Sequence, residues 1–207
     1  MTKKDSRLLL YWLYIANAHG RYSRGSSESL LDADLTTIRK GGGPQKLFDA
    51  LQQQFGRLTV DVSDFIGRGA GSPLFSLLFL ALKAKGAKDW KTGLGLSLSH
   101  QGKYHYIQYH YIFPKALIKQ KYERKEINEI ANMAFVSGRF NREISDTKPE
   151  KYLPKIVENR GEEAFTTHAI PLDSDLYLIE NYRLFLETRR KMLTDEINSF
   201  LEKVKDD

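Results

Sequence analysis

The sequence predicts an α+β protein: a mostly helical domain that contains a short strand–strand–helix element and ends in a long helix. Three observations support this prediction. Residues 1–90 have helical periodicity broken by glycine-rich segments. An aromatic, β-branched run follows at residues 104–113, and residues 174–204 carry apolar side chains at helical spacing.

Four helices are expected in the first part of the chain, over residues 6–19, 26–40, 44–55 and 72–82. Ser6 is expected to cap the first helix, and Pro44 suits the first turn of the third. The fourth helix opens at Ser72-Pro73 and is apolar nearly all round, so it should be buried.

The pattern changes after Trp90. Leucines alternate with small residues over 94–98, residues 104–113 form the best strand candidate, and 134–136 are a second short strand. The remaining expected elements are a short helix or turn over 115–122, a helical fragment over 140–145, a helix opening at 148–150 and the long helix over 174–204. Trp12 and Trp90 are expected to pack in the core or at a hinge and not to stack on bases.

Composition narrows the possible functions. The 207 residues include no cysteine, which excludes disulfides, cysteine-ligated zinc, iron–sulfur clusters and a cysteine nucleophile. The longest apolar stretch, residues 73–82, is too short for a bilayer, which needs roughly 20 residues. No signal-peptide pattern is present, so the expected location is the cytoplasm with no membrane contact.

Charge is unevenly distributed along the chain, whose net charge is +6. Residues 1–110 carry 15 basic and 8 acidic side chains, whereas residues 111–207 carry 17 and 18. A basic half beside a neutral half suits a polyanion, so residues 1–92 are predicted to be a helical, DNA-facing region. Arg21 and Arg24 lie in a Gly/Ser-rich loop that either binds phosphate or is simply solvated.

One constellation of residues has the spacing of a nuclease site. His110-Tyr111-Ile112-Phe113-Pro114 closes the predicted strand, Asn132 precedes the second strand, and Asn141 follows nine residues later on a predicted helix. This pattern resembles the His-Asn-His (ββα-metal) nuclease motif. The resemblance implies a metal ligand and a general-base histidine on the strand, a middle Asn that pins the loop, and a second ligand on the helix.

A closer resemblance covers almost the whole chain. The sequence is similar to the C-terminal nuclease half of GmrSD-type, type IV restriction endonucleases in the following words: Gly20-Arg21-Tyr22-Ser23, Lys88-Asp89-Trp90, Tyr109-His110-Tyr111-Ile112-Phe113-Pro114-Lys115, Ile127-Asn128-Glu129-Ile130-Ala131-Asn132, Asn141-Arg142-Glu143-Ile144-Ser145-Asp146 and Pro149-Glu150-Lys151-Tyr152-Leu153. It implies a ββα-metal element at 93–148, a C-terminal helical brace at 149–207, and an N-terminal nucleotide-hydrolysing half that this chain lacks.

The resemblance also assigns roles. His110 and Asn141 would hold one divalent ion, Mg²⁺ foremost, with Mn²⁺, Ni²⁺ or Zn²⁺ admitted by the imidazole. Asn132 would pin the loop. Independently of the resemblance, Lys115, Arg139, Arg142 and Lys148 stand near the motif in the sequence and are expected to hold backbone phosphates without reading the base sequence. The implied function is metal-dependent cleavage of foreign double-stranded DNA, modified DNA included, in phage defence.

Tyr111 departs from the resemblance, which implies a general-base histidine there. A tyrosine has an ordinary pKa near 10 against about 6.5 for histidine, so it is a poor base at neutral pH. Three interpretations stay open: an inactivating substitution, a natural tyrosine base, or a register in which His110 is the base. The alternative functions are a non-catalytic DNA- or partner-binding module with a decayed site and an RNA-directed nuclease.

Overall fold

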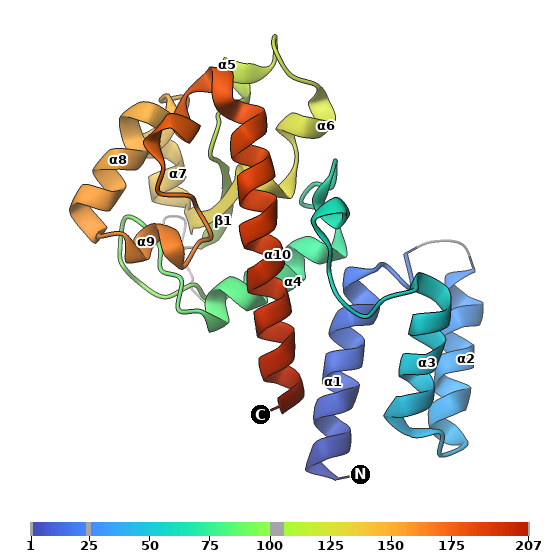
Figure 1. The fold of residues 1–207 in the computed structure, drawn as a ribbon. Coiled ribbons are helices and arrows are strands. Elements are labelled where there is room, and N and C mark those ends of the chain that lie inside the picture. Colours follow the sequence, from blue (N-terminus) through green and yellow to red (C-terminus); the bar gives the residue numbers. More distant parts are fainter. Residues whose placement is uncertain (1, 24–25, 100–105, 207) are drawn as a thin grey trace.

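The computed structural model describes residues 2–23, 26–99 and 106–206. Within them the chain is mostly helical with one two-stranded antiparallel sheet, which confirms the α+β class. Figure 1 shows the order in space: the helices α4 (Pro73–Ala84) and α10 (Tyr182–Asp206) cross the middle, the N-terminal helices lie toward the end of the molecule that holds both termini, and the sheet with the short helices lies toward the opposite end. No helix in the described part of the chain is long and apolar enough to cross a bilayer.

The N-terminal helices follow the sequence prediction closely. They are α1 (Lys3–Ala18), α2 (Ser27–Arg39), α3 (Gly43–Phe55) and α4 (Pro73–Ala84), with a 3₁₀ turn at Val62–Phe65 before α4. The first helix starts earlier than expected because its cap is Thr2 and not Ser6. The Thr2 hydroxyl accepts a hydrogen bond from the Asp5 backbone N–H, and the Asp5 carboxylate accepts one from the Thr2 backbone N–H.

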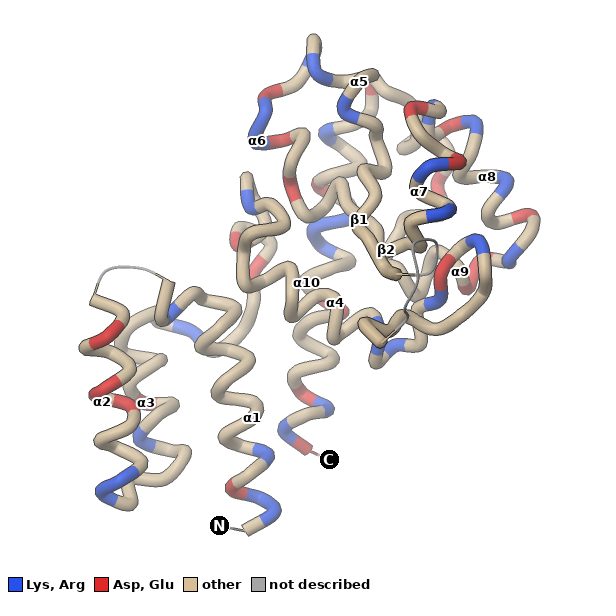
Figure 2. Tube along the Cα trace, turned by 180° about the vertical axis from the view of Figure 1, so that it is seen from behind, with Lys and Arg blue, Asp and Glu red and all other residues tan. Residues whose placement is uncertain are grey.

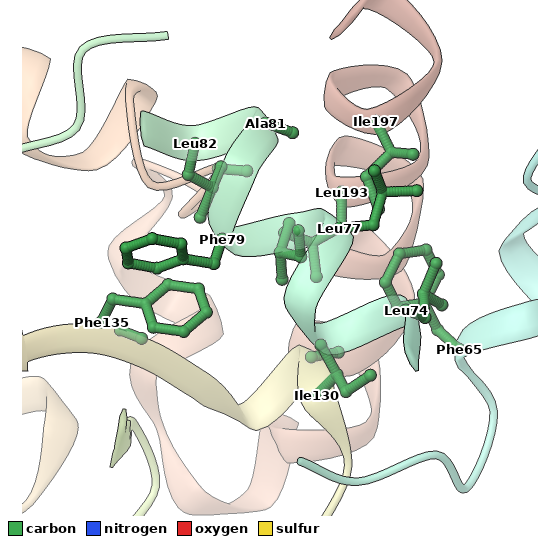
Figure 3. Close-up of a cluster of buried hydrophobic side chains, with 14 of the residues drawn as sticks. Phe65, Leu74, Leu77, Phe79, Ala81, Leu82, Ile130, Phe135, Leu193 and Ile197 are labelled. Atoms are coloured by element: carbon green, nitrogen blue, oxygen red, sulfur yellow. The ribbon is translucent and has the colours of Figure 1, made fainter. Parts of the chain in front are cut away.

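Helix α4 is the centre of the core. Ser72 caps it and Pro73 opens it, as predicted, and six of its residues are buried. Phe75 and Phe79 lie with ring centroids 4.9 Å and 5.1 Å from that of Phe135. Figure 3 shows Phe135 against Phe79, Leu77 beside Leu193 of the C-terminal helix, and Leu74 beside Phe65.

The sheet consists of β1 (Ile107–Tyr111) and β2 (Met133–Ser137), paired so that His110 faces Ala134. Both strands were predicted, but β1 ends at Tyr111 because the side chain of Asn132 takes the backbone N–H and C=O of Phe113. The predicted residues Tyr104 and His105 lie outside the described residues.

Two predictions about the strands and the last helix are wrong. Residues 94–98 form only an isolated bridge between Lys88 and Gly95. Leu96 is buried, but Leu94 and Leu98 are 51% and 79% exposed, so the alternation anchors one side chain and creates no buried face. The long helix α10 spans Tyr182–Asp206 and begins later than residue 174, since Leu178 is extended between the 3₁₀ turns Ser174–Tyr177 and Ile179–Asn181.

The remaining helices are short and surround the sheet. They are α5 (Lys115–Ile118), α6 (Arg124–Ile127), a 3₁₀ turn at Ile130–Asn132, α7 (Gly138–Ile144), α8 (Pro149–Arg160) and α9 (Glu163–Thr166). The sequence predicted α5, α7 and α8; α6 and α9 are single turns that it did not predict. This part of the fold holds the candidate site.

Candidate functional site

The site begins with the order of the elements. β1 and β2 form the hairpin, and α7 starts directly after β2 and packs against both strands. Ser137 is the N-cap of α7, and its backbone N–H donates to the buried Asp89 carboxylate at 2.6 Å. Asp89 therefore fixes where the helix leaves the sheet, and so where Asn141 lies.

His110 and Asn141 meet across this element. His110 Nδ1 lies 2.9 Å from Asn141 Oδ1, and the Asn141 amide nitrogen donates to Gln108 Oε1 at 3.0 Å. His110 is 3% exposed, and burial lowers its pKa to about 4. The imidazole is therefore neutral at physiological pH, which is the form that coordinates cations.

Tyr152 of α8 holds the other side of the imidazole. Its hydroxyl lies 3.3 Å from His110 Nε2 and donates to the Ile112 carbonyl at 2.9 Å. Since that hydrogen is committed to Ile112, the Tyr152 oxygen is free to accept from Nε2–H. His110 then turns a lone pair at Nδ1 toward Asn141, whereas the other tautomer donates from Nδ1 to Asn141 directly.

The pair of donor atoms formed by His110 Nδ1 and Asn141 Oδ1 fits a cation. In the Nε2–H tautomer, an imidazole nitrogen and an amide oxygen converge, and a metal-binding histidine usually donates its second ring N–H to a fixed acceptor. The set is small, however: the described residues contain no group of three or more His, Asp or Glu side chains placed to hold a metal. Water or phosphate oxygens would complete the ligands.

Asn132 is fully buried and holds the loop that follows β1. Its Oδ1 accepts from the Phe113 N–H at 2.8 Å, and its amide donates to the carbonyls of Phe113 and Ile127 at 3.1 Å and 3.0 Å. The Asn132 side chain thereby fixes both Phe113 and Ile127, which lie toward the two ends of the segment that connects β1 to β2. Asn132 is not itself exposed to a substrate.

Tyr111 follows His110 at the end of β1, and both residues line the same open pocket. The Tyr111 hydroxyl donates to Asn128 Oδ1 at 3.1 Å, and Lys115 Nζ lies 4.2 Å from the centre of its ring. The phenol hydrogen is engaged, so Tyr111 is not arranged to accept a proton from water.

An open pocket of about 420 Å³ lies over these residues. We call it the His110–Asn141 pocket; its walls are His110, Tyr111, Pro114, Lys115, Ala116, Asn141, Ser145 and Asp146. Asp146 is the carboxylate among them. The preceding residue, Ser145, has φ = 47°, a strained value for a residue with a side chain, and such strain concentrates at functional sites.

The predicted phosphate-binding residues are arranged unequally around this pocket. Lys115 lines it. Arg139 pairs with Glu143 at 3.3 Å, Lys148 pairs with Glu150 at 3.5 Å, and Arg142 is exposed on α7. Figure 2 shows α7 and α8 as neighbouring helices whose basic residues alternate with acidic ones.

Arg21 fits neither of the two alternatives predicted for the loop arginines. Arg21 is buried and forms a two-bond ion pair with Asp34, at 2.7 Å and 2.8 Å, so it neither binds phosphate nor lies in solvent. Arg24 lies outside the described residues.

Sequence reasoning missed Asp146, Tyr152 and Asp89 as site residues. All three stand in sequence segments that support the resemblance, but the sequence does not show which side chains they contact.

A search against protein-family models, curated proteins and solved structures finds no match for the chain. The site must therefore be interpreted from its own geometry.

Proposed function

We propose that the chain is a metal-dependent endonuclease element of the ββα-metal kind, acting on double-stranded DNA. The observation that carries the proposal is the 2.9 Å approach of His110 Nδ1 and Asn141 Oδ1, delivered by β1 and α7 to one open pocket. The strand–strand–helix order and the buried Asn132 clamp support it. The defence role against foreign, modified DNA rests on the resemblance to GmrSD-type enzymes.

His110 and Asn141 would hold the divalent ion, with Asp146 as a carboxylate at the same pocket. When bound, such an ion stabilises negative charge on a phosphate and its leaving oxygen. Lys115, at the rim beside Tyr111, would hold a neighbouring phosphate. The buried Asn132 positions the loop and touches no substrate.

Tyr111 supports a second candidate, a DNA-binding module with a decayed catalytic site. Its hydroxyl donates to Asn128, so no group at this position is arranged as a base. The two candidates differ in one measurable property: cleavage depends on a metal, whereas salt-sensitive binding by a module does not.

The test is nicking of supercoiled plasmid with Mg²⁺, with Mn²⁺ and with EDTA. We expect weak, metal-dependent nicking by the unmodified chain, a loss of about tenfold or more in Asn141→Ala, and a gain in Tyr111→His. Asn17→Ala, on the exposed face of α1, is the matched control and should be unchanged. Isothermal titration with Mn²⁺ should show weaker binding by Asn141→Ala only.

Two results would decide against the first candidate. Equal nicking by the unmodified chain and Asn141→Ala removes the ligand assignment. No nicking by Tyr111→His under any metal, with DNA binding retained, favours the second candidate.

A further inference from the structure

A second hollow, larger than the His110–Asn141 pocket, lies on the other side of α7. Its volume is about 660 Å³, and it runs between α7, the segment at Trp90 and Lys91, and α8. We call it the α7–α8 groove. Phe140, Ile144 and Ile156 contribute its apolar surface, and basic side chains of α8 line it.

The charge of this groove is strongly one-sided. Four cations line it, namely Lys91, Lys151, Lys155 and Arg160, against the single carboxylate of Glu143. Glu143 is already neutralised by Lys91 at 2.8 Å and by Arg139 at 3.3 Å. The groove therefore presents net positive charge.

Lys151 and Lys155 are the cations available to a ligand. Both are exposed, they stand one helical turn apart on α8, and no ion pair in the described part of the chain involves either. Arg160, by contrast, donates to the backbone carbonyls of Trp90 and Lys91 and is committed to the fold.

The groove is physically joined to the pocket through one side chain. Tyr152 lines the groove, while its hydroxyl lies 3.3 Å from His110 Nε2. Lys148, Lys151 and Lys155 extend along α8 over about 10 Å, the rise of about three nucleotides of one strand. A chain of phosphates along this helix would run beside the pocket.

We propose that the α7–α8 groove holds the sugar–phosphate backbone of one DNA strand next to the His110–Asn141 pocket. This rests on the proposed DNA substrate, but not on cleavage. The two available lysines of the groove lie on α8, outside the region 1–92 that the sequence analysis predicted to face DNA. There, Arg21, Arg57 and Lys85 are paired with Asp34, Asp64 and Glu196.

The experiment measures binding of a labelled DNA duplex by fluorescence anisotropy in EDTA, over a series of salt concentrations. Removing two phosphate contacts lowers the slope of log affinity against log salt by about 1.8. We expect that change in Lys151→Ala/Lys155→Ala, with affinity about tenfold weaker at low salt. Arg39→Ala/Lys40→Ala, which removes two exposed cations from the end of α2, should match the unmodified chain.

Each alternative result has a clear meaning. Equal slopes for both double variants, or a loss confined to the α2 variant, overturn the proposal. Binding of poly-glutamate in place of DNA, lost in Lys151→Ala/Lys155→Ala, shows instead that the groove takes an acidic protein segment. EDTA prevents any metal-dependent cleavage, so this binding measurement tests the groove alone. A negative nicking assay would count against the proposed nuclease activity and not against DNA binding in the groove.

Discussion

His168 is the most completely buried of the described histidines, with no measurable exposure. Its Nε2–H donates to the Lys88 carbonyl at 2.9 Å, and its Nδ1 has no hydrogen-bond partner. Burial lowers its pKa to about 4, with the nearby Arg189 acting in the same direction and Asp89 opposing it. The folded protein thus holds this imidazole neutral.

This burial predicts a loss of stability in mild acid. In the unfolded chain the pKa returns to about 6.5, so below that pH the unfolded state binds a proton that the folded state excludes. The contribution is complete above pH 6.5 and declines as the pH falls toward 4. Between pH 7 and pH 5, His168 should remove about 2 kcal/mol from the free energy of unfolding.

Urea unfolding at the two pH values checks this expectation. His168→Gln keeps a side-chain N–H but cannot titrate, so its difference between the two values should be smaller than that of the unmodified chain. His19 and His110, whose pKa values burial also lowers, contribute to the difference that persists. An unchanged difference would show that His168 is protonated in the folded state.

The meeting of His110 and Asn141 was predictable at this scale, because the nuclease motif that the sequence resembles has both residue types in this order along the chain. The contribution of Asp146 was not, since it depends on the left-handed backbone at Ser145. Tyr152 was hidden for another reason: nothing in its own helix shows that α8 packs against the end of β1. The sequence pattern identifies residues, whereas tertiary contacts decide their neighbours.

At the scale of elements, α10 is joined to the sheet by a buried arginine. Arg189 is fully buried, and its Nη1 donates to the carbonyls of Ala131 and Met133 at 2.8 Å and 2.7 Å. Its other nitrogens donate to the carbonyls of Ala169 and His168 at 3.1 Å and 3.3 Å. The two carbonyls at Nη1 flank Asn132, so α10 also fixes the turn that carries the loop clamp.

Arg189→Met should therefore be severely destabilising. Methionine fills similar space but leaves four buried carbonyls without donors, each worth about 1–3 kcal/mol. We expect the free energy of unfolding to fall by more than about 3 kcal/mol in urea titrations. Arg183→Met is the control in the same helix, because the Arg183 side chain is exposed and its ion pair with Glu126 is screened by solvent.

A loss as small as that of the control would mean that water or a moved helix satisfies these carbonyls. In that case Arg189 would not be what docks α10.

The elements themselves were predictable where local signals and burial agree. Ser72-Pro73 followed by an apolar run defines α4, and the β-branched and aromatic run defines β1. Predictions from the sequence were wrong where a local pattern has no tertiary contact to support it. Residues 94–98 alternate as a strand does, but within the described residues they pair with the chain only at the Lys88–Gly95 bridge. The break before α10 depends on the extended Leu178.

At the scale of the whole molecule, a single hydrophobic cluster crosses all three predicted segments, 1–92, 93–148 and 149–207. Helix α10 packs against α1 and α4, and α4 packs against β2. Trp12 of α1 and Trp90 near α8 both belong to this cluster, as the sequence predicted. The division into three regions remains a prediction about function, because packing does not separate them.

A continuous core predicts cooperative unfolding. Trp12→Phe and Trp90→Phe each leave one tryptophan as a reporter on one side of α10. Within each variant, the fluorescence and far-UV circular dichroism transitions in urea should share one midpoint. If Trp12 reports an earlier transition than Trp90, the α1–α3 helices unfold as a separate unit.

The two ends of the chain lie side by side, at the end of the molecule away from α5 and α7 (Figure 1). Arg7 of α1 donates to the backbone carbonyl of Asp206 at 3.3 Å. An affinity tag, a surface-coupling handle or a fused protein would therefore leave from one and the same pole, whichever terminus carries it. If the protein were immobilised through either end, the His110–Asn141 pocket would face away from the surface and be accessible to a large ligand in solution.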